Sequence, residues 1–383
     1  MSNLNYDCLS ISKGLFIMNI LLLFSHPWKF GGGETYVLSL AKGLIERGHN
    51  VVLVTGLVNF DLQVANVHHY QLPFRTKNPF KYFTIYQQLK QLVLKHDINI
   101  IHAQYRTAGY FGAMIERKMG IPFVLTLHDD WHNAPFKSIH GKLFKHVIAV
   151  SEAIRQRFIK KFLAEPNNIV TIYNGVDAKK FNDKMLLESN AADLKKRFGI
   201  LPEEKVITLL GRIRRAKGHF DLIDALDHMK SCQIPFRFLI VGDGPEKEEL
   251  ANKVVEKGMS DKVVFTGYLS DIPAVITATD ILVLPSYREA FPLSIIEAML
   301  VRKPVIASAV GGIVEIIENN RNGLLIQPGF PRQLAEKIIN LLEDPLLCQQ
   351  LGSAGYKKAI AHYTLDHMVN STVSYYETVL FNY

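Results

Sequence analysis

The sequence predicts an α/β protein made of two domains, each built around a doubly wound parallel sheet. The chain has 383 residues, whereas a single domain usually has about 100–200. Short β-branched runs alternate with segments of helical apolar spacing, a pattern typical of βαβ units and parallel sheets. This alternation runs through the first half of the chain and restarts after residues 174–177, so we expect two successive sheets.

The first series begins with the apolar run 15–24. This run is too short to cross a bilayer, which takes about 20 apolar residues, and no small-residue cleavage site follows it. We expect a buried strand at Asn19–Phe24 after a disordered extension over residues 1–17, with Met18 as a candidate initiator. The later elements expected here are a helix at Glu34–Arg47, strand Val51–Thr55, helix Phe80–Lys95, strand Ile98–His102, helix Gly109–Met119, strands Pro122–Leu127 and Val147–Val150, and a helix that Ser151 caps.

The second series is expected to form a domain at residues 200–363, after a first domain at 18–185 and a linker within 178–200. Residues 364–383 are expected to form a helix that packs back on the first domain. The expected strands are Val206–Leu210, Arg237–Val241, Val263–Phe265, Ile281–Pro285, Val305–Ala307 and Leu324–Ile326, and the expected helices are Asp221–Met229, Glu246–Lys257, Leu293–Leu300 and Pro331–Leu342.

Composition narrows the class of protein without identifying it. Hydrophobic residues make up 48% and charged residues 21%, which argues against extended disorder. The net charge is +8, but Lys and Arg are spread along the chain, so nucleic-acid binding is not indicated. An anionic membrane surface, a site for a diphosphate and a generally basic surface all remain open. Cys8, Cys232 and Cys348 lie far apart, which suggests neither a disulfide framework nor a zinc site and favours a reducing cytoplasm.

The most informative segment is Pro285–Leu300, where a loop joins a strand to a helix. Pro292 suits the first position of that helix, because its missing N–H costs nothing there. Free backbone N–H groups at the start of the helix, with the helix dipole behind them, would form an anion site. The residues expected to present these groups are Phe291, Leu293 and Ser294.

Two glutamates flank this expected anion site. Glu297 would lie about one turn inside the helix, where a carboxylate can accept two hydrogen bonds from a ribose. Glu289, on the loop, could reach hydroxyls of the group attached to the phosphate. The alternative is a helix-start loop that carries two solvated glutamates.

A basic turn, Gly211–Gly218, follows an apolar strand. Arg212 offers a bidentate guanidinium and Lys217 an ammonium, which suit a diphosphate leaving group as negative charge develops on it. The alternative is a basic surface turn. The sequence has neither an Asp-x-Asp nor an H-E-x-x-H motif, so no metal is indicated, and Arg212 with Lys217 could replace a bridging cation.

The first domain offers two weaker features. Gly31–Gly33, followed by Glu34, would let the backbone approach a ligand closely, although neither a Walker nor a dinucleotide fingerprint is present. His128 ends an expected strand and could bond a sugar hydroxyl or polarise the reacting centre. The alternative for His128 is a purely structural histidine.

Two other segments resemble functional motifs only in part. Gly242–Pro245 begins like a dinucleotide fingerprint, but its proline and missing third glycine leave hydride chemistry unsupported. The basic helix Ser151–Phe162 could lie on a membrane, and a plain surface helix is the alternative.

These segments, in this order, resemble the retaining glycosyltransferases of family 4, whose GT-B fold has two Rossmann-like doubly wound domains facing across a cleft. The resemblance runs from about Asn19 to about Tyr363. It rests on G-G-G-E, S-E-A-I-R, N-G-V-D, G-R-…-K-G, V-G-D-G-P and two glutamates separated by seven residues. It implies a metal-independent hexosyltransferase that uses a nucleotide-diphosphate sugar, UDP- or GDP-linked, as substrate and has no cofactor.

The resemblance also implies residue roles. Arg212 and Lys217 would hold the donor diphosphate, Glu289 the donor sugar and Glu297 the nucleotide ribose. The backbone around Phe291–Ser294 would take the phosphates.

Further roles implied by the resemblance concern the base and the first domain. The base is expected near Tyr268, while Gly32 and His128 would face the donor sugar. A diphosphate oxygen would deprotonate the acceptor, so Glu289 is not expected to be a covalent nucleophile as in retaining glycosidases. Ala290 stands where many members have glycine, so the sugar pocket is expected to differ in shape.

The sequence does not identify the acceptor. The main hypothesis is a lipid-linked or polysaccharide acceptor of a cell-envelope glycan, with the enzyme in the cytoplasm or in peripheral contact with the inner face of the plasma membrane. One alternative is a small soluble acceptor. Another is a non-catalytic nucleotide-sugar-binding protein, against which the intact Arg212, Lys217, Glu289 and Glu297 argue.

Overall fold

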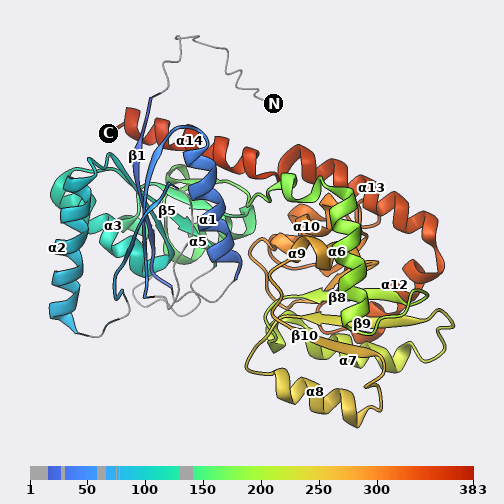
Figure 1. Cartoon of the computed structure of the whole chain (residues 1–383). Coiled ribbons are helices and arrows are strands. Elements are labelled where there is room, and N and C mark those ends of the chain that lie inside the picture. Colours follow the sequence, from blue (N-terminus) through green and yellow to red (C-terminus); the bar gives the residue numbers. More distant parts are fainter. Residues whose placement is uncertain (1–15, 27–30, 58–65, 75, 77, 130–140) are drawn as a thin grey trace.

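The computed structural model describes residues 16–26, 31–57, 66–74, 76, 78–129 and 141–383. It confirms the expected fold class, because the chain forms two α/β domains with one parallel sheet each (Figure 1). The extension expected over residues 1–17 lies almost wholly outside the described residues.

The first sheet has the strand order β3-β2-β1-β4-β5-β6-β7, and every neighbouring pair is parallel. Its central strands are nearly continuous apolar runs, as expected for a parallel sheet that helices cover on both faces. The strands are β1 (Asn19–Phe24), β2 (Asn50–Thr55), β3 (His68–Gln71), β4 (Ile100–Gln104), β5 (Phe123–Leu127), β6 (Val147–Ala149) and β7 (Ile169–Thr171), and the helices are α1 (Gly32–Ile45), α2 (Pro79–Lys95), α3 (Tyr105–Met119) and α5 (Glu152–Phe162).

The second sheet has the order β10-β9-β8-β11-β12-β13 and is also parallel throughout. Its strands are β8 (Lys205–Leu210), β9 (Phe236–Val241), β10 (Val263–Gly267), β11 (Ile281–Leu284), β12 (Val305–Ser308) and β13 (Leu324–Ile326). Its helices are α7 (His219–Ala225), α8 (Lys247–Glu256), α9 (Ile272–Ala278), α10 (Leu293–Leu300), α11 (Ile313–Ile316), α12 (Pro331–Glu343) and α13 (Pro345–His362).

The connection between the domains is more ordered than the sequence suggested. Residues 178–200 hold a short 3-10 turn, Ala178–Phe181, and the helix α6 (Lys184–Arg197). Asp183 caps this helix by accepting a hydrogen bond from Leu186 N, and Asn190 Nδ2 donates to Asp271 at the start of α9. The helix therefore belongs to the second domain.

The last helix, α14 (Leu365–Phe381), leaves the second domain and lies along the first (Figure 1). Met368, Val369 and Tyr376 are buried in one cluster with the outer face of β1. A Cβ on Gly43 of α1 would lie 2.5 Å from Val369 Cγ2, so the absence of a side chain at Gly43 lets the two helices approach closely. The C-terminal segment therefore completes the core of the first domain.

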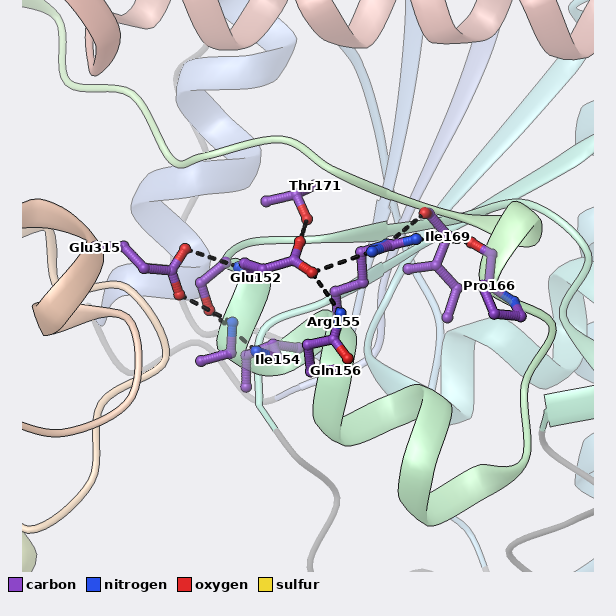
Figure 2. Close-up of polar contacts among 10 residues, drawn as sticks. Glu152, Ile154, Arg155, Gln156, Pro166, Ile169, Thr171 and Glu315 are labelled. Carbon is purple, nitrogen blue, oxygen red and sulfur yellow. Dashed lines mark hydrogen bonds and ion pairs between the residues drawn. The ribbon is translucent and has the colours of Figure 1, made fainter. Parts of the chain in front are cut away.

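The carboxyl ends of the two sheets face each other. Glu315 of α11, which follows β12, accepts hydrogen bonds from Glu152 N (2.8 Å) and Ala153 N (2.9 Å) at the start of α5, which follows β6 (Figure 2). A carboxylate from one domain thus caps a helix of the other, where the helix dipole favours it. Asn174, beyond β7, donates to the carbonyl oxygen of Phe291, beyond β11, at 3.2 Å.

The helix α5 is not a free amphipathic helix. Its apolar residues Ile154, Phe158 and Phe162 are buried in the first domain, and only its basic face reaches solvent. The structure therefore favours the surface-helix interpretation of this segment over the membrane one.

Candidate functional site

The loop between β11 and α10 is held on both sides by glycines. Gly218 has φ +74°, and a Cβ there would lie 2.0 Å from the carbonyl oxygen of Pro285. On the other side, Gly312 N donates to Glu289 O at 3.2 Å, and a Cβ on Gly311 (φ +50°) would lie 1.8 Å from that same oxygen. No side chain fits at either contact. The pair Gly311–Gly312 was missed from the sequence, although two adjacent glycines after an apolar strand would have been a signal.

This packing brings two of the predicted residues together. Lys217 Nζ lies 2.7 Å from Glu289 Oε1, and Ser286 Oγ donates to the same carboxylate oxygen at 2.8 Å. The Glu289 side chain is only 7% exposed. One charged donor and one neutral donor therefore hold a buried carboxylate in place. The pair stands at the carboxyl end of the second sheet, where ligands of doubly wound folds bind.

The helix beside this pair, α10, has the predicted bounds Leu293–Leu300, but the role of Pro292 differs from the prediction. Pro292 is not its first residue but its N-cap, in an extended conformation with ψ 121°, and α10 starts at Leu293. The fixed φ of proline fits both positions, so the sequence could not separate them. Leu293 and Ser294 form the first turn, whose N–H groups have no acceptor within the helix.

Phe291 bridges the domains. Its ring stacks on Tyr173 at 5.0 Å and meets Tyr363 edge-on at 5.4 Å, while its carbonyl accepts from Asn174. Its side chain is buried, so it shapes the loop from the side of the domain contact.

Glu297 lies one turn inside α10, as predicted, and is half-buried. Burial raises the pKa of Glu297 to about 7, and the positive charge of Lys180 partly opposes that rise. Lys180 comes from the connection between the domains and was not singled out from the sequence.

Arg212 and Tyr268 lie on the same edge of the second sheet, and both are exposed. The turn that carries Arg212 rests on the loop after β9, where a Cβ on Gly242 would lie 2.1 Å from the carbonyl oxygen of Gly211. A Cβ on Gly244 would lie 2.0 Å from the carbonyl oxygen of Ile213. The glycines of the V-G-D-G-P segment thus support the Arg212 turn, which accounts for a motif that failed as a dinucleotide fingerprint.

In the first domain, His128 follows β5 and its ring is held by neighbours. Its Nε2 lies 2.7 Å from Gln104 Oε1, and its ring meets Tyr36 at 4.7 Å and Tyr105 at 5.1 Å between centroids. Burial, with a smaller effect from His26, lowers the pKa of His128 to about 3. Because Gln104 Oε1 accepts, the proton of this neutral ring is on Nε2 and Nδ1 is an acceptor.

Tyr105 and His26 extend this group and were missed from the sequence. Tyr105, the first residue of α3, has φ +69°, a strained conformation for a side chain of this size. Its ring lies 3.8 Å from that of His26, and a Cβ on Gly33 would lie 2.1 Å from its hydroxyl. A Cβ on Gly32, in contrast, would meet no atom of the described residues within 4 Å.

Family models cover most of the chain. The model for glycosyltransferase family 4 matches residues 30–180, and the model for glycosyl transferases group 1 matches residues 190–358. The chain belongs to glycosyltransferase family 4. Each model falls on one of the two domains described above.

Three relatives illustrate the range of this glycosyltransferase family. The N-acetyl-alpha-D-glucosaminyl L-malate synthase of Bacillus anthracis is 26% identical over 92% of this chain and 94% of its own. An Escherichia coli UDP-Gal:alpha-D-GlcNAc-diphosphoundecaprenol alpha-1,3-galactosyltransferase is 27% identical over 68% of this chain and 70% of its own. The crystal structure of Anabaena Alr3699/HepE in complex with UDP and glucose has a TM-score of 0.81 and 25% identity, and covers 93% of this chain and 98% of its own.

The predicted residues of this glycosyltransferase thus form two groups. Lys217 pairs with Glu289 in the second domain, but neither bonds to Arg212 or Glu297. His128 and Gly32 belong to the facing edge of the first domain. Within the described ranges, no cluster of three His, Cys, Asp or Glu residues could hold a metal ion. No helix in the described part of the chain is both long and apolar enough to cross a bilayer.

Proposed function

We propose that this glycosyltransferase moves a sugar, with retention, from a nucleotide-diphosphate sugar to a lipid-linked or polysaccharide acceptor of a cell-envelope glycan. The donor lies against the second domain and the acceptor against the first. The reaction uses no metal ion and no cofactor.

The observation that carries this proposal is the Lys217–Glu289 pair beside the start of α10, with Glu297 one turn further on. The ammonium of Lys217 and the exposed guanidinium of Arg212 supply positive charge for a diphosphate. The N–H groups of Leu293 and Ser294 add donors and a favourable dipole. The carboxylate of Glu297 binds ribose hydroxyls, and Glu289 binds the transferred sugar.

The chemistry needs one bond to break and one to form. The bond from the anomeric carbon to the diphosphate oxygen breaks, and Lys217 with Arg212 stabilises the charge left on that oxygen. The acceptor oxygen attacks from the same face and gives its proton to the departing diphosphate. His128, which is neutral, accepts a hydrogen bond at Nδ1 from a hydroxyl of the donor sugar.

The choice of donor and acceptor rests on relatives. The Anabaena structure holds UDP and glucose, and the Escherichia coli relative uses a UDP-sugar and a diphosphoundecaprenol acceptor. The Bacillus anthracis relative, named for a malate product, supports the alternative of a small soluble acceptor. A purely nucleotide-sugar-binding protein is the third possibility.

The test is a panel of UDP-, GDP- and ADP-sugars, scored by thermal stabilisation and then by calorimetry. Ligand that binds the folded state raises its apparent stability. One base should stabilise the wild type, and Lys217→Ala and Glu297→Ala should each weaken that binding by at least about tenfold, because each removes a hydrogen bond to a charged group.

Lys230→Ala and Glu336→Ala are matched controls, since both side chains are exposed and pair only with residues outside the predicted site. Normal binding by both site variants would refute the site assignment. Donor hydrolysis by the wild type would distinguish an enzyme from a binding protein. Transfer to a lipid-linked rather than a soluble acceptor would decide between the two hypotheses for the enzyme.

A further inference from the structure

A group of large aromatic side chains is exposed where α2 begins. Phe80 is 82% and Phe83 64% exposed, and Tyr82 and Tyr110 are exposed beside them. Apolar side chains scattered singly are normal on a surface, but a contiguous patch of this kind marks an interaction site. The patch joins α2 to the neighbouring α3.

The patch lies beside a hollow, and one of its aromatic rings is held in place by stacking. It borders a shallow hollow of about 320 Å³ whose lining includes Tyr82, Phe83, Tyr86, Tyr110, Met114 and Lys118. The ring of Tyr82 stacks on buried Phe111 at 5.7 Å, which holds it in place. Lys118 Nζ lies 5.1 Å from the centre of the Tyr86 ring, so a positive charge stands at the edge of the hollow.

The exposed charges on the described helices α2 and α3 have one sign. Lys81 and Lys90 on α2 and Arg117 and Lys118 on α3 are all exposed. The helix α2 contains no acidic residue, and the one acidic residue of α3, Glu116, is buried. Aromatic side chains among lysine and arginine suit the headgroup region of an anionic bilayer. A second copy of the same face would instead bring like charges together.

The patch also lies at the right edge of the domain. The first residues of α2 follow the carboxyl end of β3, and Tyr110 lies little more than one helical turn from Tyr105. Both features place the patch on the edge that carries His128 and Gly32. An acceptor whose lipid is held in a bilayer would therefore reach the first-domain group from this side.

We propose that the face formed by α2 and α3 docks the protein on an anionic bilayer, with Phe80 and Phe83 inserted among the headgroups. This proposal rests on the proposed function, in which the acceptor belongs to a cell-envelope glycan. Vesicle binding is measured without donor or acceptor, so the two proposals can fail independently.

The experiment is sedimentation of the full chain with vesicles of phosphatidylcholine alone or of phosphatidylcholine mixed with phosphatidylglycerol. We expect binding to the anionic vesicles, weakened by high salt, because charge attracts and salt screens it. The double variant Phe80→Ser/Phe83→Ser should lower the partition coefficient by about tenfold or more, since it keeps every charge but removes the inserted rings.

The control is Leu346→Ser/Phe381→Ser, which removes two side chains that are 71% and 90% exposed elsewhere. This control separates docking by this face from the general attraction of a protein with net charge +8. The proposal is overturned if the wild type does not bind anionic vesicles, or if both double variants bind equally well. The proposal is also overturned if Phe80→Ser/Phe83→Ser keeps vesicle binding but loses self-association in sedimentation equilibrium. It is likewise overturned if this variant keeps vesicle binding but loses binding of a detergent-solubilised lipid-linked acceptor.

Discussion

Glu297 titrates in the range in which donor binding would be measured. Its pKa is raised to about 7 by burial, whereas a nucleotide ribose is bound best by the ionised carboxylate, which accepts from both hydroxyls. We expect the affinity for the preferred nucleotide sugar to rise as the pH increases from 6 to 8, by about tenfold at most. The diphosphate of a nucleotide sugar is ionised throughout this range and does not contribute. In Glu297→Gln the affinity should be lower and flat with pH, measured by calorimetry. A sloped profile in the variant would assign the titration to another group.

The raised pKa of Glu297 also predicts that the protein without ligand becomes less stable as the pH rises. A folded-state pKa above the unfolded value of 4.5 means that the folded state holds more protons between pH 4.5 and 7. The free energy of unfolding should therefore fall as the pH rises through this window, by at most about 3 kcal/mol, from this group. Urea unfolding of the wild type and of Glu297→Gln at pH 5 and 8 would measure the difference. Glu336→Gln, on an exposed face, should follow the wild type.

His128 is predicted to act as a neutral ring. Its pKa near 3 leaves the imidazole uncharged above pH 5, so its loss should not change the shape of the pH–rate profile. We expect His128→Ala to lower kcat by about 10–100-fold, through a lost hydrogen bond to the sugar, with nucleotide affinity unchanged. His228→Ala, an exposed histidine in the other domain, is the control. A profile that loses a limb in His128→Ala would show instead that the ring carries a proton during the reaction.

At the scale of elements, the contact between Glu315 and α5 ties one domain to the other. Its carboxylate accepts from two N–H groups, at 2.8 and 2.9 Å (Figure 2), and the charge lies at a helix N-terminus. Glu315→Gln keeps only one acceptor and turns an N–H₂ toward a donor. We expect a loss of about 1–2 kcal/mol in the free energy of unfolding, from urea titration. Glu336→Gln should cost less than about 0.5 kcal/mol, and equal losses in the two variants would rule out a specific cap.

The elements also show what sequence can predict and where it stops. Apolar strands such as β1 and β8 were placed within a residue, because a buried parallel strand leaves a continuous apolar run. The strand β3 (H-H-Y-Q) was missed, because it lies at the sheet edge and has no β-branched residue. The pairing of Lys217 with Glu289 depends on glycines at Gly218 and Gly311, far apart in the chain. The cap by Glu315 joins residues more than 160 positions apart, and no local pattern encodes it.

At the scale of the whole molecule, α14 makes the first domain depend on the end of the chain. Tyr376 is fully buried, and its hydroxyl lies 2.5 Å from His102 Nδ1, while His102 Nε2 lies 2.6 Å from Thr126 Oγ1. Burial lowers the pKa of His102 to about 3, so this polar chain stays neutral within the core. The helix therefore supplies both apolar packing and the hydrogen-bond partner of His102, a buried histidine of the first sheet.

This arrangement predicts that damage to α14 destabilises the first domain and spares the second. Tyr376→Ala leaves a cavity and an unpaired imidazole, which should cost about 3–5 kcal/mol and lower the melting temperature of the first domain by about 10 °C. Differential scanning calorimetry with the stabilising nucleotide sugar separates the unfolding transitions of the two domains, because the ligand raises the melting temperature of the second domain only. Phe381→Ala, on the same helix but 90% exposed, should leave both transitions in place. If Tyr376→Ala instead lowered the second transition by as much as the first, the helix would stabilise the pair of domains as one unit, and the donor site would depend on α14 as well.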